Sequence, residues 1–165
     1  MSHVPLYAYA LFLILLRVGI SRCFPRTIRV ERLLTMPILM LALGIHGFFS
    51  LFSSPNATDL LAGACGLALG SVVGYLHARG WNIVVDGAKR RISVPGDVLM
   101  LAVILATFVF EFALHYAIES NTVPATTPLL PPLAAAVWAL FLGMTAGRNF
   151  SLASRFRRTL RSAPA

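Results

Sequence analysis

Charged residues are scarce in this 165-residue chain, where they make up only 12% of the sequence. Soluble globular domains carry about one quarter. Apolar residues account for 58%, and the mean hydropathy is +0.78. A soluble domain of about 150 residues still exposes roughly 30% of its unfolded-chain surface, so it cannot hide this much apolar surface. The composition argues against a soluble enzyme, a soluble nucleic-acid-binding domain and a disordered tail, and it indicates a multi-pass membrane protein.

Acidic residues are the rarer charged type, with six Asp and Glu against fourteen Lys and Arg, which gives a formal net charge of +8. In a soluble protein this excess would suggest binding to nucleic acid. Here the basic residues lie between apolar runs, and no stretch interleaves them with aromatic residues as single-strand binders do. We therefore expect no nucleic-acid partner.

Cysteine is nearly absent, since only Cys23 and Cys65 occur and their spacing does not fit a metal-binding pair. The N-terminus also lacks the basic region that opens a secretory signal peptide. No nucleophile, base and orienting residue can be grouped from the sequence. We therefore expect no enzymatic activity, no catalytic residues, no cofactor and no metal.

Five apolar runs are each close to the roughly 20 residues needed to cross a bilayer. They cover 4–20, 33–52, 60–78, 98–118 and 133–150. The predicted fold is an all-α integral membrane protein with a single transmembrane domain over 1–150. A basic, flexible cytoplasmic tail is expected over 151–165.

The basic residues predict the orientation of these spans. All fourteen fall within 22–32, 79–91 and 155–161 or, as Arg17 and Arg148, at the ends of spans on that same side. The two opposite connections contain no Lys or Arg. Because cytoplasmic loops retain positive charge, the sequence predicts an N-out/C-in topology.

The connection at 81–95 has a pattern of its own. Two β-branched runs flank Asp86-Gly87, which is a strong signal for a β-hairpin. We expect a short cytoplasmic hairpin, with Asp97 capping the helix that follows. An isolated hairpin is marginally stable, so this one should pack on the basic first loop, on lipid headgroups or on a partner.

Glycines recur four residues apart in the third and fifth runs: Gly66, Gly70 and Gly74, then Gly143 and Gly147. Such rows let helices approach closely in lipid. Packing within the chain and a homodimer interface are both open at this point. The matching Leu-x-Leu-Gly segments are compatible with a duplicated two-helix unit or with chance similarity.

Ionisable residues inside the spans are the main candidates for a functional site. Glu111 and His115 lie one turn apart on the fourth span, and depth counting places His46 and Cys65 near the level of Glu111. Intramembrane carboxylate and histidine groups serve in proton or cation relays. The alternatives are a buried structural pair that orients helices and, with less support, a metal site.

Several motifs together resemble small five-span bacterial inner-membrane proteins. They are Arg22-Cys-Phe-Pro-Arg26, Pro37 after Arg32, Gly70-x-x-x-Gly74, Trp81 through Gly96, and Phe108 to Tyr116. This family is of unknown function, and one related group is labelled CcdC-like. The resemblance implies the bacterial inner membrane and, through the label, an association with cytochrome c maturation. The chain has no Cys-x-x-C and no haem-attachment motif.

Two functions are predicted from these observations. The first is an accessory or oligomeric inner-membrane protein without catalytic activity, whose partners are membrane lipids and either further copies of itself or another membrane protein. The second is a small transporter or channel component that handles protons or cations through the Glu111, His115, His46 and Cys65 layer.

Overall fold

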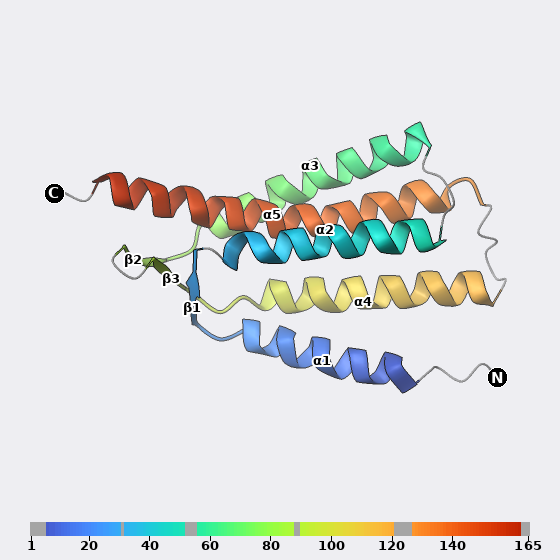
Figure 1. Cartoon of the computed structure of the whole chain (residues 1–165), viewed down its shortest axis with the longest axis horizontal. Coiled ribbons are helices and arrows are strands. Elements are labelled where there is room, and N and C mark those ends of the chain that lie inside the picture. Colours follow the sequence, from blue (N-terminus) through green and yellow to red (C-terminus); the bar gives the residue numbers. More distant parts are fainter. Residues whose placement is uncertain (1–5, 31, 52–55, 88–89, 121–126, 163–165) are drawn as a thin grey trace.

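The computed structural model describes residues 6–30, 32–51, 56–87, 90–120 and 127–162. The helices are α1 (Leu6–Arg22), α2 (Arg32–Leu51), α3 (Ala57–Arg79), α4 (Val98–Glu119) and α5 (Leu130–Ser162). The strands are β1 (Arg26–Arg29), β2 (Val84–Asp86) and β3 (Arg91–Val94). The helices run side by side along the long axis, and the strands gather at the end where α5 finishes (Figure 1).

Three of the described helices, α3, α4 and α5, are long and apolar enough to cross a membrane. Only 17%, 6% and 28% of their most apolar windows are buried within the chain. Apolar helices with this much exposed surface need a surrounding of lipid or of other apolar chains. The fold is mainly helical, and its three long apolar helices are those expected of a membrane protein.

The closest helix packing joins α3 to α5. Gly66, Gly70 and Gly74 on α3 each face a backbone carbonyl of α5 so closely that a Cβ would overlap its oxygen. In return, Gly143 and Gly147 on α5 face carbonyl oxygens of α3. Without side chains between them, the two backbones gain dispersion and Cα–H···O contacts. The glycine rows thus face each other within one chain.

The helices α1 and α4 form a second, looser pair. The rings of Phe12 and Phe108 lie with their centroids 5.3 Å apart, and Leu101 packs over Gly19. Away from the sheet, α4 meets α2 and α5 in an apolar cluster around Phe48, Leu114 and Trp138.

The predicted hairpin is confirmed as β2 and β3, and a third strand extends it. The sheet has the order β1-β3-β2 with antiparallel pairing, and Ile28 on β1 lies opposite Ile92 on β3. Of the three expected packing partners, the basic first loop is therefore the one found, since β1 forms from it. Ile92 is fully buried between the sheet and the helices.

The segment expected to be a flexible tail differs in the structure, because α5 continues without interruption to Ser162. Its 33 residues span about 50 Å, well beyond the roughly 30 Å of a bilayer core. Leu152 and Phe156, one turn apart, are buried against the sheet, while Arg157 and Arg161 face outward. Because these apolar residues are buried against the sheet, the segment from 151 to 162 is helical.

A proline in α2 explains one contact between α2 and α5. Pro37 has no N–H, so the carbonyl of Leu33 loses the donor that a helix would normally give it. The side-chain amide of Asn149 donates to that carbonyl oxygen at 2.7 Å. Asn149 therefore satisfies a buried acceptor that the sequence of α2 leaves open.

Candidate functional site

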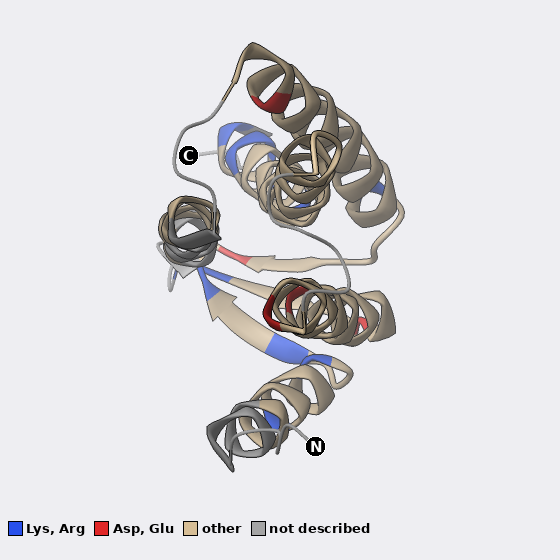
Figure 2. Ribbon diagram, turned by 90° about the vertical axis from the view of Figure 1, so that its right-hand side faces the viewer, with Lys and Arg blue, Asp and Glu red and all other residues tan. Residues whose placement is uncertain are grey.

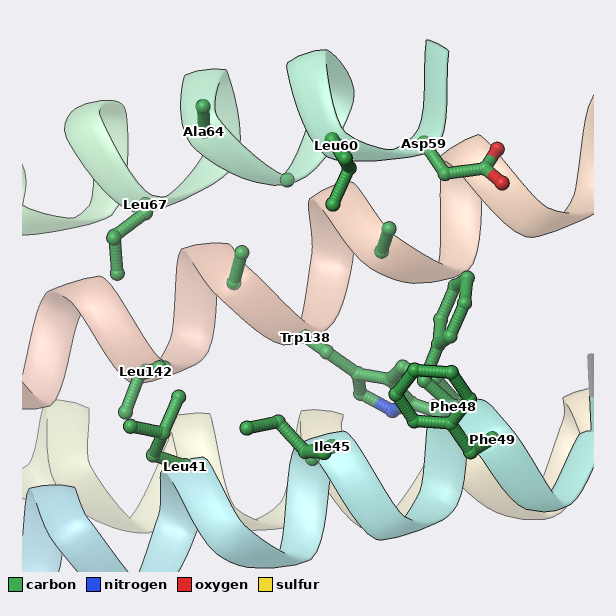
Figure 3. Close-up of a pocket in the computed structure, with 14 residues that line it drawn as sticks. Leu41, Ile45, Phe48, Phe49, Asp59, Leu60, Ala64, Leu67, Trp138 and Leu142 are labelled. Carbon is green, nitrogen blue, oxygen red and sulfur yellow. The ribbon is translucent and has the colours of Figure 1, made fainter. Parts of the chain in front are cut away.

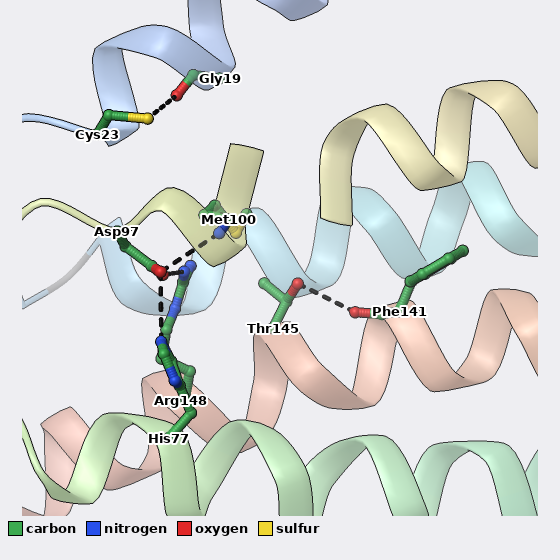
Figure 4. Close-up of polar contacts among 8 residues, drawn as sticks. All are labelled: Gly19, Cys23, His77, Asp97, Met100, Phe141, Thr145 and Arg148. Carbon is green, nitrogen blue, oxygen red and sulfur yellow. Dashed lines mark hydrogen bonds and ion pairs between the residues drawn. The ribbon is translucent and has the colours of Figure 1, made fainter. Parts of the chain in front are cut away.

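Asp97 is the centre of a buried polar junction at the sheet end of the molecule (Figure 4). It precedes α4, and its carboxylate accepts a hydrogen bond from the Met100 N–H at 3.3 Å, which confirms the predicted cap. Arg148 on α5 donates to its second oxygen at 2.9 Å. His77 on α3 lies 3.3 Å from its first oxygen. One carboxylate thus connects α3, α4 and α5.

Backbone and aromatic contacts fix this junction from both sides. The N–H of Asp97 donates to the Arg22 carbonyl at 2.9 Å, and a Cβ on Gly96 would overlap the Cys23 carbonyl oxygen. The guanidinium of Arg148 lies 6.0 Å from the ring centre of Trp81, within cation–π range. The end of α1 is thereby held against Gly96 and Asp97, the two residues that precede α4.

Arg26, the first residue of β1, has an unsatisfied guanidinium near this junction. Its Nε and Nη1 atoms are buried and have no hydrogen-bond partner. Burial lowers its pKa to about 10, the positive charges of Arg22 and Arg148 act in the same direction, and Asp97 opposes them. Arg26 therefore remains charged at neutral pH in a region with more positive than negative groups.

Glu111 and His115 lie next to each other on α4, as their spacing predicts. His115 Nε2 is 3.8 Å from a Glu111 carboxylate oxygen, which suits an ion pair but is too long for a hydrogen bond. The Glu111 side chain is 35% exposed and the His115 side chain is 46% exposed, so the chain covers each of them only in part. Trp138 on α5 lies near Glu111, but its buried indole N–H has no hydrogen-bond partner among the described residues.

The other two residues of the predicted layer lie elsewhere. His46 is exposed on α2, and Cys65 is exposed on α3. Within the described ranges, no group of three or more His, Cys, Asp or Glu side chains could hold a metal ion. The structure brings together only Glu111 and His115.

An apolar cleft of about 350 Å³ separates α2 from α3 (Figure 3). Ile45 and Phe48 line it from α2, Leu60 and Leu67 from α3, and Trp138 forms part of its floor on α5. Asp59 lies at its end and caps α3, accepting a hydrogen bond from the Asn56 N–H at 2.8 Å. The cleft offers apolar contact and few polar groups, as expected of a surface that faces lipid.

Sequence reasoning missed the roles of Arg148, His77 and Asn149. Arg148 and Asp97 are 51 residues apart, so no local pattern pairs them. The position of Arg148 within an apolar span was a usable signal, because a charge there needs a partner. Pro37 was a second signal, since it requires an outside donor for Leu33.

Comparison of the chain with protein-family models, with curated proteins and with solved structures found no match.

Proposed function

We propose that this chain is a five-span, N-out/C-in protein of the bacterial inner membrane that has no enzymatic activity and acts by assembling with other membrane-embedded chains. The observation that carries this proposal is the partial exposure of Glu111 and His115 in the second half of the apolar helix α4. An ionisable side chain facing hydrocarbon costs several kcal/mol. A second copy or a partner protein that covers α4 would remove this cost.

The alternation of the helices supports the five-span topology. The sheet and the C-terminal part of α5 lie at one end of the molecule, and the C-terminal ends of α2 and α4 lie at the other (Figure 1). Every described Arg of the predicted cytoplasmic connections belongs to the sheet end, as the positive-inside rule expects. The resemblance to five-span inner-membrane proteins, including the CcdC-like group, supports the same location.

The topology can be tested with single cysteines in a variant that lacks Cys23 and Cys65. Thr58→Cys lies at the far end of α3, and Gly80→Cys lies at the sheet end in open space. A membrane-impermeant thiol reagent added to intact spheroplasts should label Thr58→Cys at once and Gly80→Cys only after permeabilisation. The reverse pattern would contradict the orientation, and labelling of both from outside would contradict the number of spans.

Assembly can be tested by native mass spectrometry of the protein extracted from its host in a mild detergent. We expect further chains at a fixed stoichiometry. Glu111→Gln should reduce the assembled fraction at least tenfold, because it removes the charge to be covered. Glu119→Gln is the matched control, since Glu119 ends the same helix and is exposed there. A well-folded wild-type monomer without partners would overturn the proposal.

Proton or cation transport is the second candidate, and the pairing of Glu111 with His115 beside Trp138 favours it. In liposomes loaded with a pH-sensitive dye, this function requires a flux that Glu111→Gln abolishes while the unfolding temperature stays unchanged. Loss of stability without any flux in the wild type would instead assign the pair a structural role.

A further inference from the structure

The cleft between α2 and α3 is an apolar hollow in the helical part of the molecule (Figure 3). Both helices pack on α5, and at the floor of the cleft the ring centroids of Phe48 and Trp138 lie 6.0 Å apart. Left empty, the cleft would deprive its walls of dispersion contacts. Water would find few polar partners in it. The cleft therefore needs an apolar occupant.

The cleft covers the depth of a single membrane leaflet. Its walls run from Leu41 to Phe49 on α2 and from Asp59 to Leu67 on α3, which is about 12 Å along each helix. Half of the hydrocarbon core is roughly 15 Å thick. Asp59 is the third residue of α3, so the cleft begins close to the membrane surface at the end away from the sheet. From there it extends towards the centre of the bilayer.

The size of the cleft excludes a helix as its occupant. A helix about 10 Å across fills roughly 900 Å³ over a length of about 12 Å, whereas the cleft offers about 350 Å³. A partner helix can therefore only cover its mouth. A sealed apolar cavity of about 150 Å³ holds one benzene molecule, so the cleft has room for roughly a dozen carbon atoms. This is the size of the part of a lipid acyl chain that lies within one leaflet.

The charges at this end of the molecule indicate the headgroup of that lipid. Asp59 and Glu119 lie here, whereas no Arg of the described ranges does. Seen from this end, α3 and α4 carry acidic segments (Figure 2). Asp59 is buried and caps α3, so it acts on a headgroup through its electric field and not by contact. A negative field favours a headgroup with an ammonium group over an anionic headgroup.

We infer that the cleft binds one acyl chain of a phospholipid with an amine-bearing headgroup, such as phosphatidylethanolamine. The chain fills the space that separates α2 from α3 and contacts Trp138. This site rests on the proposed crossing of the membrane by α2, α3 and α5, but it requires neither the orientation nor the assembly.

Trp138 provides the test, because it lines the cleft and is one of only two tryptophans in the chain. In a Trp81→Phe background, its fluorescence is measured in a non-ionic detergent while phosphatidylethanolamine with brominated acyl chains is added. Bromine quenches tryptophan fluorescence only on close approach. Quenching should saturate near one lipid per chain, whereas lipid held loosely around the protein would quench without saturation.

Two substitutions fill the cleft from opposite walls. Ala64→Phe places a ring in it from α3, and Gly44→Leu fills it from α2, where an added Cβ meets nothing within 4 Å. Each should raise the lipid concentration needed for half-maximal quenching at least tenfold. Ala68→Phe is the matched control, because Ala68 is exposed one turn further along α3 and does not line the cleft. It should behave like the wild type.

The headgroup is tested with phosphatidylglycerol that has the same brominated chains. The wild type should need about two- to fivefold more of this lipid than of phosphatidylethanolamine. Asp59→Asn keeps an oxygen for the Asn56 N–H and should reduce this difference without abolishing quenching. Equal affinity of the wild type for the two lipids would overturn the assignment of the headgroup.

The acyl-chain site is overturned if quenching of the wild type does not saturate, if both filling variants keep it, or if Ala68→Phe loses it. Native mass spectra of the same samples show bound lipid and bound chains as separate mass differences. If added lipid released one copy of the chain from another, the cleft would be assigned to a second copy instead. A failure of the lipid site is therefore distinguishable from a failure of the proposed assembly.

Discussion

The two helix pairs of this protein are held together in different ways. Between α3 and α5, glycines bring backbone against backbone at five successive positions. Between α1 and α4, the contacts described above are made by side chains, with Phe12 on Phe108 and Leu101 over Gly19. Lipid removes most of the hydrophobic driving force for association, so close backbone packing stabilises more than scattered side-chain contacts do. We infer a firm α3–α5 unit and a looser α1–α4 unit, joined at the sheet end through Asp97.

The largest expected effect is at the connection between the two units. Asp97→Ala leaves Arg148 buried without its carboxylate and also removes the cap of α4. We expect it to lower the free energy of unfolding by about 3–5 kcal/mol. Hydrogen exchange should increase at the start of α4 but not in the middle of α3. Asp86→Ala, at an exposed position of β2, should cost less than about 1 kcal/mol. Equal losses in the two variants would show that Asp97 does not join the units.

The next effect tests the firm unit itself. Gly70→Ala places a Cβ against the Leu140 carbonyl, and neither backbone can move without disturbing the neighbouring glycine contacts. We expect a loss of about 2–3 kcal/mol in detergent-based unfolding. Gly44→Ala is the matched control, because nothing lies within 4 Å of the added atom, and it should cause no loss. A harmless Gly70→Ala would contradict the backbone packing.

A third prediction concerns the contact that ties α2 to the firm unit. Asn149→Ala leaves the Leu33 carbonyl without a donor and should cost about 1–2 kcal/mol. Pro37→Ala restores an N–H that can reach this carbonyl within the helix. In that background the cost of Asn149→Ala should therefore fall by about 1 kcal/mol. A double-mutant cycle measures this coupling. A coupling of zero would show that Asn149 does not compensate for the N–H that Pro37 lacks.

The smallest effect is expected in the looser unit. Phe108→Ala removes the ring contact with Phe12 and should cost about 0.5–1.5 kcal/mol. Val109→Ala, at the exposed neighbouring position, should be nearly neutral. If Phe108→Ala destabilised the protein as much as Gly70→Ala, the contrast between the two pairs would be lost.

Local patterns were sufficient to predict the helices, the hairpin and the cap at Asp97, because each depends on residues a few positions apart. They were insufficient for β1. The segment Arg-Thr-Ile-Arg looks like a basic connection, and it becomes a strand only by pairing with β3, more than sixty residues later. The extension of α5 was missed for a similar reason, since Leu152 and Phe156 are buried only because the sheet is present to cover them.

The candidate site shows the same limit. The spacing of Glu111 and His115 was enough to place them together, because one helical turn separates them. Depth along a span was not enough to predict whether His46 and Cys65 join this pair, because residues at one level can point in any direction around their helices. For the glycine rows, the sequence indicated close packing but left open which helix they contact.

The contact between α3 and α5 also imposes an order on biosynthesis. A chain emerging from the ribosome releases α3 into the membrane before either of the following helices exists. The glycine face of α3 then has no counterpart until Gly143 and Gly147 have been made, and α4 must be inserted in between. For that interval α3 depends on lipid or on an insertion chaperone, and a chain truncated after α4 would keep an adhesive backbone surface open to wrong neighbours.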